Sequence, residues 1–179
     1  MKKIILLSTL LLTSLVFSQK FEISAGYGLP SGYGILNFLT TILPNSFLRV
    51  EGSDNVGVLN VSALVYSKDA KWRYGLDMVS EFYSFNRIEI RKQSAISVMP
   101  RIDYFWSEED KKLRFYSGVS AGIYLATLKY NIAQEEVNYT IFGFNITPIG
   151  LRYGKTFAVF IEPNIGIKGL IQAGASYRF

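Results

Sequence analysis

The chain has 179 residues, of which 49% are hydrophobic, 15% aromatic and 18% charged, with a formal net charge of +5. It contains no cysteine and no histidine, which excludes disulfides, thiol chemistry, the Ser-His-Asp and Cys-His catalytic arrangements and the commonest metal ligand. No block of basic residues indicates nucleic-acid binding, and we expect no cofactor and no metal site.

The first 18 residues predict a cleaved secretory signal peptide. Two lysines precede an apolar stretch that runs to Phe17, and the small residue Ser18 follows. This is the order of a basic region, an apolar region and a cleavage site. A transmembrane anchor is the alternative, but the apolar stretch is short and no basic cluster follows it. We expect a mature domain at 19–179.

From Lys20 onward the dominant period is two, which predicts strands. Eight are expected, at 20–28, 55–66, 72–86, 93–106, 113–129, 138–153, 156–167 and 170–179. Short polar turns alternate with other connections, as in bacterial outer-membrane barrels with short periplasmic turns. We therefore predict an all-β fold, an eight-stranded antiparallel up-and-down transmembrane β-barrel. Its outside connections are expected at 29–54, 86–92, 131–138 and 168–169.

The first outside connection, 29–54, carries a different pattern. Apolar residues between Ile35 and Leu43 have helix-like spacing, and Pro44 and Asn45 would end such a helix. One interpretation is a short helix that packs on the barrel mouth. The other is a helix that binds a partner or rests on the membrane.

The polar face of the predicted strands carries five carboxylates and five arginines: Glu22, Arg73, Asp77, Glu81, Arg101, Asp103, Arg114, Arg152, Glu162 and Arg178. Lysine is confined to predicted turns and loop ends, at Lys68, Lys71, Lys92, Lys111, Lys112, Lys155 and Lys168. A balanced set of arginines and carboxylates suits a packed interior, because charges away from water must be paired and the planar guanidinium favours bidentate pairing. A solvated outer face is the alternative.

Large aromatic residues on the apolar face stand beside the predicted short turns: Trp72, Trp106, Tyr153, Tyr177 and Phe179. Their common level predicts an aromatic girdle at the periplasmic membrane–water interface. In a soluble sandwich these residues would be scattered in a core.

Pro100 and Pro163 fall inside predicted strands. Proline cannot donate to a ladder, and a closed barrel has no edge strand to hold it. We therefore expect a bulge or an early end of pairing at each.

Several segments resemble the outer-membrane β-barrel domain family of Bacteroidota, which comprises small OmpX- or OmpA-like eight-stranded barrels. They are FEISAGYGLP, WRYGLDM, PRIDYFW, GLRYGK and EPNIGIKGLIQAGASYRF. The resemblance implies an outer-membrane location. It also implies that the final strand, with Tyr177 and Phe179, is the signal read by the barrel assembly machinery. It specifies architecture and no activity.

An eight-stranded barrel has an interior just wide enough to be filled by side chains. Besides the charges, Tyr83, Phe105, Tyr116 and Tyr124 would fill it. We expect a non-enzymatic, monomeric outer-membrane protein with a structural or loop-mediated surface role. Its partners would be outer-membrane lipid, the assembly machinery and an extracellular partner of the 29–54 loop. Two alternatives are a narrow, porin-like channel and a soluble lipocalin-like binder of small ligands. An enzyme is disfavoured, because without histidine only a Ser-Lys or carboxylate-pair site remains, and Asp77 and Glu81 have Arg73 and Arg101 as expected partners.

Overall fold

The computed structural model describes residues 20–29, 53–85, 90–130 and 136–179. The predicted signal peptide and the helix expected between Ile35 and Leu43 lie outside the described residues. Within the described ranges, no helix has the length and apolarity needed to cross a membrane.

Nine strands make up most of the described chain: β1 (Phe21–Leu29), β2 (Ser53–Tyr66), β3 (Trp72–Phe85), β4 (Ile90–Phe105), β5 (Leu113–Tyr130), β6 (Glu136–Gly154), β7 (Phe157–Pro163), β8 (Ile165–Gly166) and β9 (Ile171–Arg178). All eight predicted strands are present, and their ends agree to within three residues. The seventh is interrupted at Asn164, which separates β7 from the two-residue β8.

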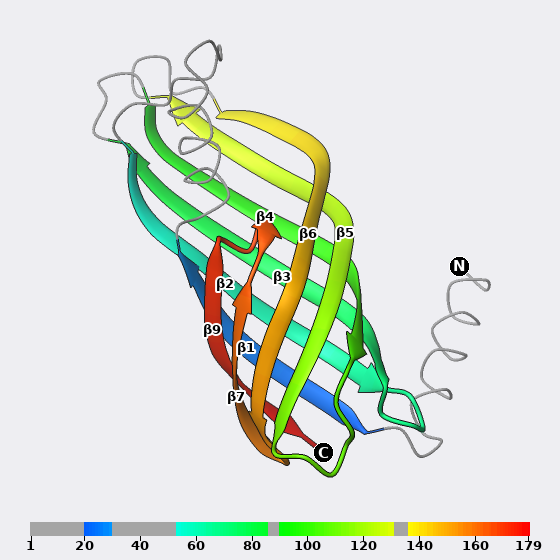
Figure 1. The fold of residues 1–179 in the computed structure, drawn as a ribbon. Coiled ribbons are helices and arrows are strands. Elements are labelled where there is room, and N and C mark those ends of the chain that lie inside the picture. The colour runs from blue at the N-terminus through cyan, green and yellow to red at the C-terminus, as the bar shows by residue number, and fades with distance from the viewer. Residues whose placement is uncertain (1–19, 30–52, 86–89, 131–135) are drawn as a thin grey trace, which may run out of the picture.

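The strands form one closed antiparallel sheet (Figure 1). Neighbours in the chain pair from β1 to β6, β9 pairs with both β7 and β1, and the ring includes β6–β7. With β7 and β8 counted as one interrupted strand, this is an eight-stranded up-and-down barrel. The fold prediction is therefore confirmed.

The short turns and the C-terminus lie at one end of the barrel (Figure 1). In the turn after β2, Ser67 and Asp69 hydrogen-bond each other, and the Asp69 carboxylate also accepts from the Lys71 backbone N–H at 3.1 Å. In the turn after β6, Gly154 has φ +129°, and a Cβ there would lie 2.1 Å from the Phe157 carbonyl oxygen. Local hydrogen bonds and one glycine thus allow these tight reversals.

The wall accommodates Pro100 and Pro163 in different ways. The β4–β5 pairing omits Met99 and Pro100 and then resumes in the same register. Pro163 is the last residue of β7, and β6 and β7 pair only as far as Ile161. At Pro163 the expectation fits, because the pairing with β6 ends early and β6 then pairs with β8 with its register shifted by one residue. At Pro100 the ladder is only interrupted.

A third proline, Pro148 in β6, coincides with a bulge that the sequence analysis missed. Tyr116 pairs with Gly150, but Gly118 pairs with Thr147, so β6 carries one extra residue between these pairs. The missing N–H of proline explains why the ladder breaks there.

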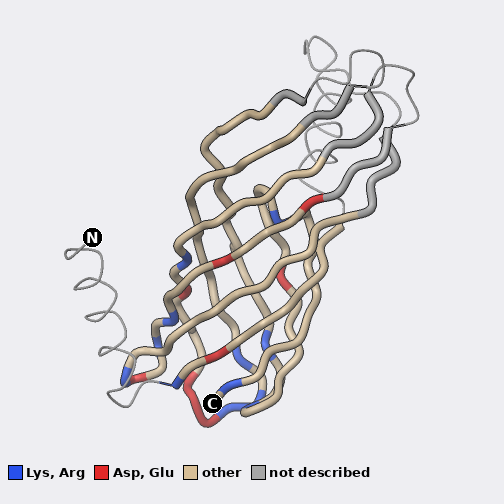
Figure 2. The backbone as a smooth tube through the Cα atoms, turned by 180° about the vertical axis from the view of Figure 1, so that it is seen from behind, with Lys and Arg blue, Asp and Glu red and all other residues tan. Residues whose placement is uncertain are grey.

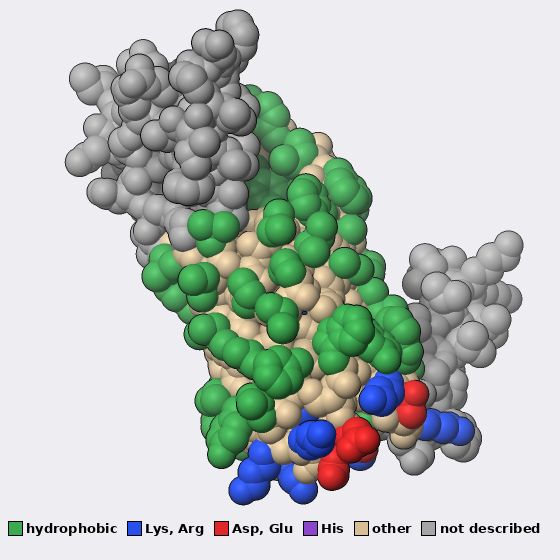
Figure 3. All heavy atoms as spheres, in the orientation of Figure 1, with side chains coloured by type: hydrophobic (Ala, Val, Ile, Leu, Met, Phe, Trp, Pro, Cys, Tyr) green, Lys and Arg blue, Asp and Glu red, His purple; other side chains and the backbone are tan. Residues whose placement is uncertain are grey.

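The side chains of the strands separate into an exposed apolar set and a buried polar set. Leu76, Met78 and Ile123 are each at least half exposed, whereas Asp77 and Arg101, on the other face, are buried. Apolar side chains cover most of the visible outer wall, and charged ones gather at the end with the short turns (Figure 3). Other charged residues lie along the strands well inside the length of the barrel (Figure 2). The barrel is thus apolar outside and polar inside.

The connection between β8 and β9 folds into the barrel rather than away from it. Ile167 packs against two interior clusters, formed by Val58, Val79 and Met99 and by Ala95, Tyr124 and Ala126. The Lys168 side chain is buried. The backbone passes so close to β1 that a Cβ on Gly28 would lie 2.0 Å from the Lys168 carbonyl oxygen.

The prediction that Lys168 lies in an exposed outside turn is therefore wrong. The physical reason lies in the interior charges. Asp77 and Glu162 both point into the lumen beneath this turn, and the Lys168 ammonium nitrogen is 2.5 Å from Asp77 Oδ2 and 3.9 Å from Glu162 Oε2. A buried carboxylate requires a nearby cation, and the inward turn supplies it.

Candidate functional site: the charged interior and the aromatic end of the barrel

Glu22 of β1 holds cations from two other strands. Its carboxylate forms ion pairs with Arg73 of β3 and with Arg152 of β6, the latter at 2.7 Å. The Tyr66 hydroxyl donates to it at 3.0 Å. Alternation places Glu22 inward from β1, and the ion pair with Arg152 is one to a residue 130 positions away in the chain.

Asp103 joins this group to the next arginine. Its carboxylate accepts from Arg73 Nε at 2.9 Å and from Arg101 Nε at 2.8 Å. Arg73 and Asp103 are directly paired across β3 and β4, so strand register brings them together.

Arg101 extends the network to β7 and back to β3. Its guanidinium lies 2.6 Å from Glu162 Oε1 and 3.5 Å from Asp77 Oδ1. The Tyr116 hydroxyl donates to Glu162 at 2.6 Å. Lys168, from the inward turn, completes the group at Asp77.

The connected interior network contains four carboxylates and four cations: Glu22, Asp77, Asp103, Glu162, Arg73, Arg101, Arg152 and Lys168. Every member is at most 5% exposed. Equal numbers of opposite charges let each carboxylate be paired without water, which a buried charge requires. The network crosses the lumen between strands on opposite parts of the wall.

The other three predicted interior charges, Glu81, Arg114 and Arg178, make different contacts. Arg114 is buried, stacks 4.0 Å from the centre of the Phe105 ring, and donates to the Ala70 carbonyl oxygen at 2.7 Å. Glu81 is buried and accepts from the Tyr124 hydroxyl at 2.7 Å.

Arg178 lies near the end of the barrel and is half-buried rather than fully buried. It pairs with Glu109 at 3.3 Å, and Lys20 bonds the same carboxylate. The hydrogen bond from Lys20, followed by the charges of Lys20 and Arg178, lowers the pKa of Glu109. This small cluster ties the start of β1 to the turn after β4 and to the last strand.

The carboxylates of the interior network are engaged by cations rather than gathered around a metal site. Among the residues that the structure describes, no group of three carboxylates, histidines or cysteines could hold a metal ion. The carboxylates Asp77 and Glu162 are held by cations rather than poised toward an open space. The members of the network neutralise one another's charges, and their side chains fill the barrel interior.

The five aromatic residues expected to form a girdle are all exposed. Their exposed fractions are 44% for Trp72, 63% for Trp106, 57% for Tyr153, 47% for Tyr177 and 68% for Phe179. Each stands within two residues of a strand end at the short-turn side of the barrel. Trp72 and Trp106 both contact Tyr104, with ring centroids 4.8 and 5.1 Å apart.

The last residues of the chain are held by β1. Phe179 donates its backbone N–H to the Phe21 carbonyl oxygen at 2.8 Å, and the two rings lie 5.9 Å apart. Tyr177 and Phe179 contact edge to face at 4.9 Å. The C-terminal aromatic pair therefore sits on the outer wall at the seam between the first and last strands.

Tyr66, Phe157 and Lys168 are among the residues that sequence reasoning missed. Alternation along the second strand places Tyr66 on the inward face with Leu64, so its interior position could have been predicted from the sequence. Phe157, 63% exposed and paired with Tyr177, follows the third turn directly and fits the aromatic pattern. Lys168 carried no signal, because period-two reasoning does not apply to a turn that folds inward.

The fold is similar to those of two outer-membrane β-barrels of known structure. One is the N-terminal β-barrel domain of Pseudomonas aeruginosa OprF, with a TM-score of 0.52 and 15% identity over 89% of this chain and 97% of that one. The other is neisserial surface protein A, with a TM-score of 0.51 and 11% identity over 89% of this chain and 95% of that one. The chain has the fold of an eight-stranded outer-membrane β-barrel. At these identities the likeness shows fold alone. No family model matches the sequence, and no curated protein matches it.

Proposed function

We propose that this barrel is an integral outer-membrane protein, non-enzymatic and monomeric, whose interior is sealed by side chains and whose role is structural or exerted through its outer loops. The observation that carries the proposal is the reversal of polarity, with charges paired inside and apolar side chains exposed outside. A protein that folds in water exposes its charges and buries its apolar surface. A barrel in lipid does the opposite with its outer wall.

The dimensions of the apolar wall support a membrane location. On β5, the outward residues from Leu113 to Leu125 are apolar except Ser117, and both ends of the row are about half exposed. Twelve residue steps of about 3.4 Å, tilted by about 40°, span about 30 Å along the barrel axis. This matches the roughly 30 Å hydrocarbon core of a bilayer.

The soluble lipocalin-like alternative requires an apolar interior and a polar exterior. Leu76 and Ile123, which would have to line the calyx, are exposed, and Arg101, which would have to be solvated, is buried. We therefore do not favour it. A narrow channel differs from the sealed barrel only in whether ions pass the network around Arg101.

At the short-turn end, we interpret the exposed aromatics as an interfacial girdle and Tyr177 with Phe179 as the assembly signal. The cleaved signal peptide and an extracellular partner of the 29–54 connection belong to the same proposal. The narrower resemblance to OmpX-like barrels of Bacteroidota remains a prediction.

Membrane fractionation of cells expressing the chain tests the location. The protein should be found in the outer-membrane fraction, and it should migrate differently on gels before and after boiling, because a closed barrel resists unheated detergent. Recovery in the periplasmic soluble fraction would refute the proposal. Planar-bilayer recordings separate the sealed barrel from the channel, since the sealed form gives no discrete conductance steps.

A further inference from the structure

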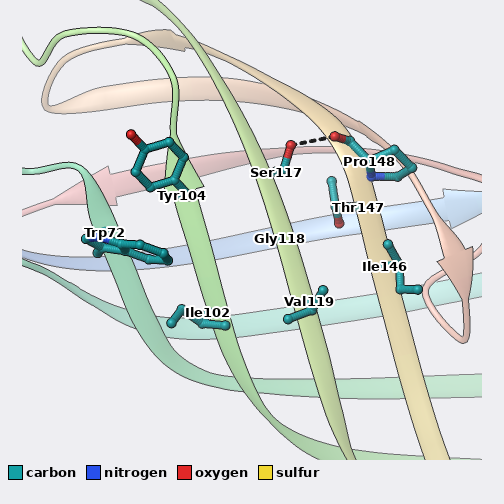
Figure 4. Close-up of a pocket in the computed structure, with 9 residues that line it drawn as sticks. All are labelled: Trp72, Ile102, Tyr104, Ser117, Gly118, Val119, Ile146, Thr147 and Pro148. Atoms are coloured by element: carbon teal, nitrogen blue, oxygen red, sulfur yellow. Dashed lines mark hydrogen bonds between the residues drawn. The ribbon is translucent and has the colours of Figure 1, made fainter.

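A hollow lies in the outer wall over β3 to β6, near the short turns (Figure 4). Its volume is about 230 Å³. Apolar and aromatic side chains form most of its lining: Trp72, Ile102, Tyr104, Val119, Ile146 and Pro148.

The hollow exists because the small residue Ser117 stands in a row of large residues on the outer wall. Trp72 pairs with Tyr104, and Tyr104 pairs with Ser117, so the three outward side chains stand at one level of the wall. Beyond Ser117 the extra residue of the β6 bulge places Pro148 at the far side. The serine is the floor between taller neighbours (Figure 4).

The one hydroxyl on this floor is already engaged. Ser117 Oγ donates to the Pro148 carbonyl oxygen at 2.5 Å, and the Trp106 indole N–H donates to Ser117 Oγ at 3.0 Å. These bonds fix the two sides of the hollow and leave mainly carbon on its surface. The fitting occupant is a hydrocarbon, because contact with this lining removes apolar surface from polar surroundings.

The position of the hollow indicates which hydrocarbon can reach it. It is continuous with the exposed apolar wall formed by residues such as Tyr74 and Ile123, which the proposed function places against lipid. An acyl chain of the surrounding bilayer therefore reaches it directly. The aromatic rim at Trp72 and Tyr104 lies on the side of the short turns, where headgroups begin.

The charges at the short-turn end of the barrel favour one class of headgroup. Lys71 immediately precedes Trp72, and Asp69 in the same turn is bound by Ser67 and the Lys71 backbone. The exposed or half-buried charged side chains at this end comprise seven cations and four acids: Lys20, Lys68, Lys71, Lys111, Lys112, Lys155 and Arg178 against Asp69, Glu108, Glu109 and Asp110. In the face shown in Figure 3, basic and acidic side chains gather below the apolar wall. A net positive rim favours a negative headgroup.

We propose that this hollow is a binding site for an anionic phospholipid, with one acyl chain over Ser117 and the phosphate near Lys71. The inference rests on the proposed membrane location and goes beyond it, because a smooth wall would contact all bilayer lipids alike. The site differs from the rest of the wall in shape, through the Pro148 bulge and the small Ser117, and Lys71 directly precedes its lining residue Trp72 in the chain.

Tryptophan quenching by brominated lipids tests the site, because the chain's two tryptophans, Trp72 and Trp106, both stand at the hollow. The protein is reconstituted in phosphatidylcholine vesicles with increasing fractions of brominated phosphatidylglycerol or brominated phosphatidylcholine. One lysine near a charged surface contributes enough to lower the half-quenching fraction about fivefold for the anionic lipid. Equal half-quenching fractions for the two lipids would overturn the proposal.

Three variants locate the effect. Val119→Phe fills the hollow and should abolish the anionic preference, and Lys71→Gln should reduce it, whereas Lys155→Gln, in the turn after β6, should leave it intact. A preference that survives Val119→Phe, or that Lys155→Gln lowers as much as Lys71→Gln does, would refute the assignment.

A reporter on another part of the wall separates this inference from the proposed function. Replacing both tryptophans by phenylalanine and introducing Tyr177→Trp places the probe on β9, away from the hollow. That probe should be quenched equally by both lipids. If neither brominated lipid quenches any of the probes, the protein is not in the bilayer, and both the proposed function and this site fail.

Discussion

Replacing Lys168 by methionine tests the interior network at the residue whose position was least expected. The ammonium nitrogen lies 2.5 Å from Asp77 Oδ2 and 3.9 Å from Glu162 Oε2, and the side chain is 1% exposed. Methionine keeps an unbranched chain of similar length and removes only the charge and its hydrogen bonds. The change therefore leaves two buried carboxylates with Arg101 as their shared cation.

The expected loss is large because the carboxylates cannot move into water. Breaking a buried ion pair costs about 3–5 kcal/mol of unfolding free energy, since it leaves an uncompensated buried charge. Arg101 remains 3.5 Å from Asp77 and should keep the loss near the lower end of that range. Adding Asp77→Asn removes the stranded charge, so the double variant should be more stable than the sum of the two single losses predicts, by about 1–3 kcal/mol.

The assay is reversible urea unfolding in lipid vesicles, followed by tryptophan fluorescence, for the two single variants and the double variant. Lys155→Met is the matched control, because Lys155 is exposed in the turn after β6 and its replacement should cost about 0–1 kcal/mol. If Lys168→Met costs no more than this control and adds to Asp77→Asn without coupling, Lys168 faces water and the inward turn is wrong.

Three further predictions address the wall, the C-terminus and the rim. Leu76→Arg should cost about 2–4 kcal/mol and Tyr153→Arg about 0–1 kcal/mol in the same unfolding assay, because arginine is least tolerated near the bilayer midplane; equal losses would contradict the assigned depths. Phe179→Asp should reduce outer-membrane assembly in cells more than refolding into detergent, and equal losses in both would count against the assembly signal. The folded-state pKa of Glu109 is lowered, chiefly by the Lys20 hydrogen bond, so its stabilisation is present above its unfolded pKa of about 4.3 and disappears as the pH falls through the folded value. The stability difference between the wild type and Glu109→Gln should therefore shrink with falling pH below about 4.3, and a constant difference would refute the ion pair.

The strands and their facing could be predicted from the sequence because both follow from one local rule. Alternation with a period of two fixes which side chains share a face, and a closed barrel has only two faces. This rule alone predicts that Arg73 and Asp103 share the inner face, since directly paired positions on adjacent strands point the same way.

The choice of partners could not be predicted in the same way. Glu22 pairs across the lumen with Arg152, and that contact depends on how the barrel closes rather than on the sequence near either residue. The inward turn could not be predicted, because the sequence around Lys168 is that of an ordinary exposed turn. Its inward direction depends on the carboxylates beneath it, which only the folded barrel brings there. Pro148 was visible, but its effect on the outer wall depends on Ser117, a residue that only strand register brings beside it.

The inward turn also makes closure of the barrel an all-or-none event. Through β7 the interior network holds four carboxylates, Glu22, Asp77, Asp103 and Glu162, but only three cations, Arg73, Arg101 and Arg152. The fourth cation arrives with Lys168, on the connection that leads into β9, the strand that seals the seam against β1. If the last strand detaches and takes Lys168 with it, the lumen is left with one unpaired negative charge. Detachment of β9 is therefore opposed both by the loss of the Lys168–Asp77 ion pair and by the loss of the backbone hydrogen bonds to β1.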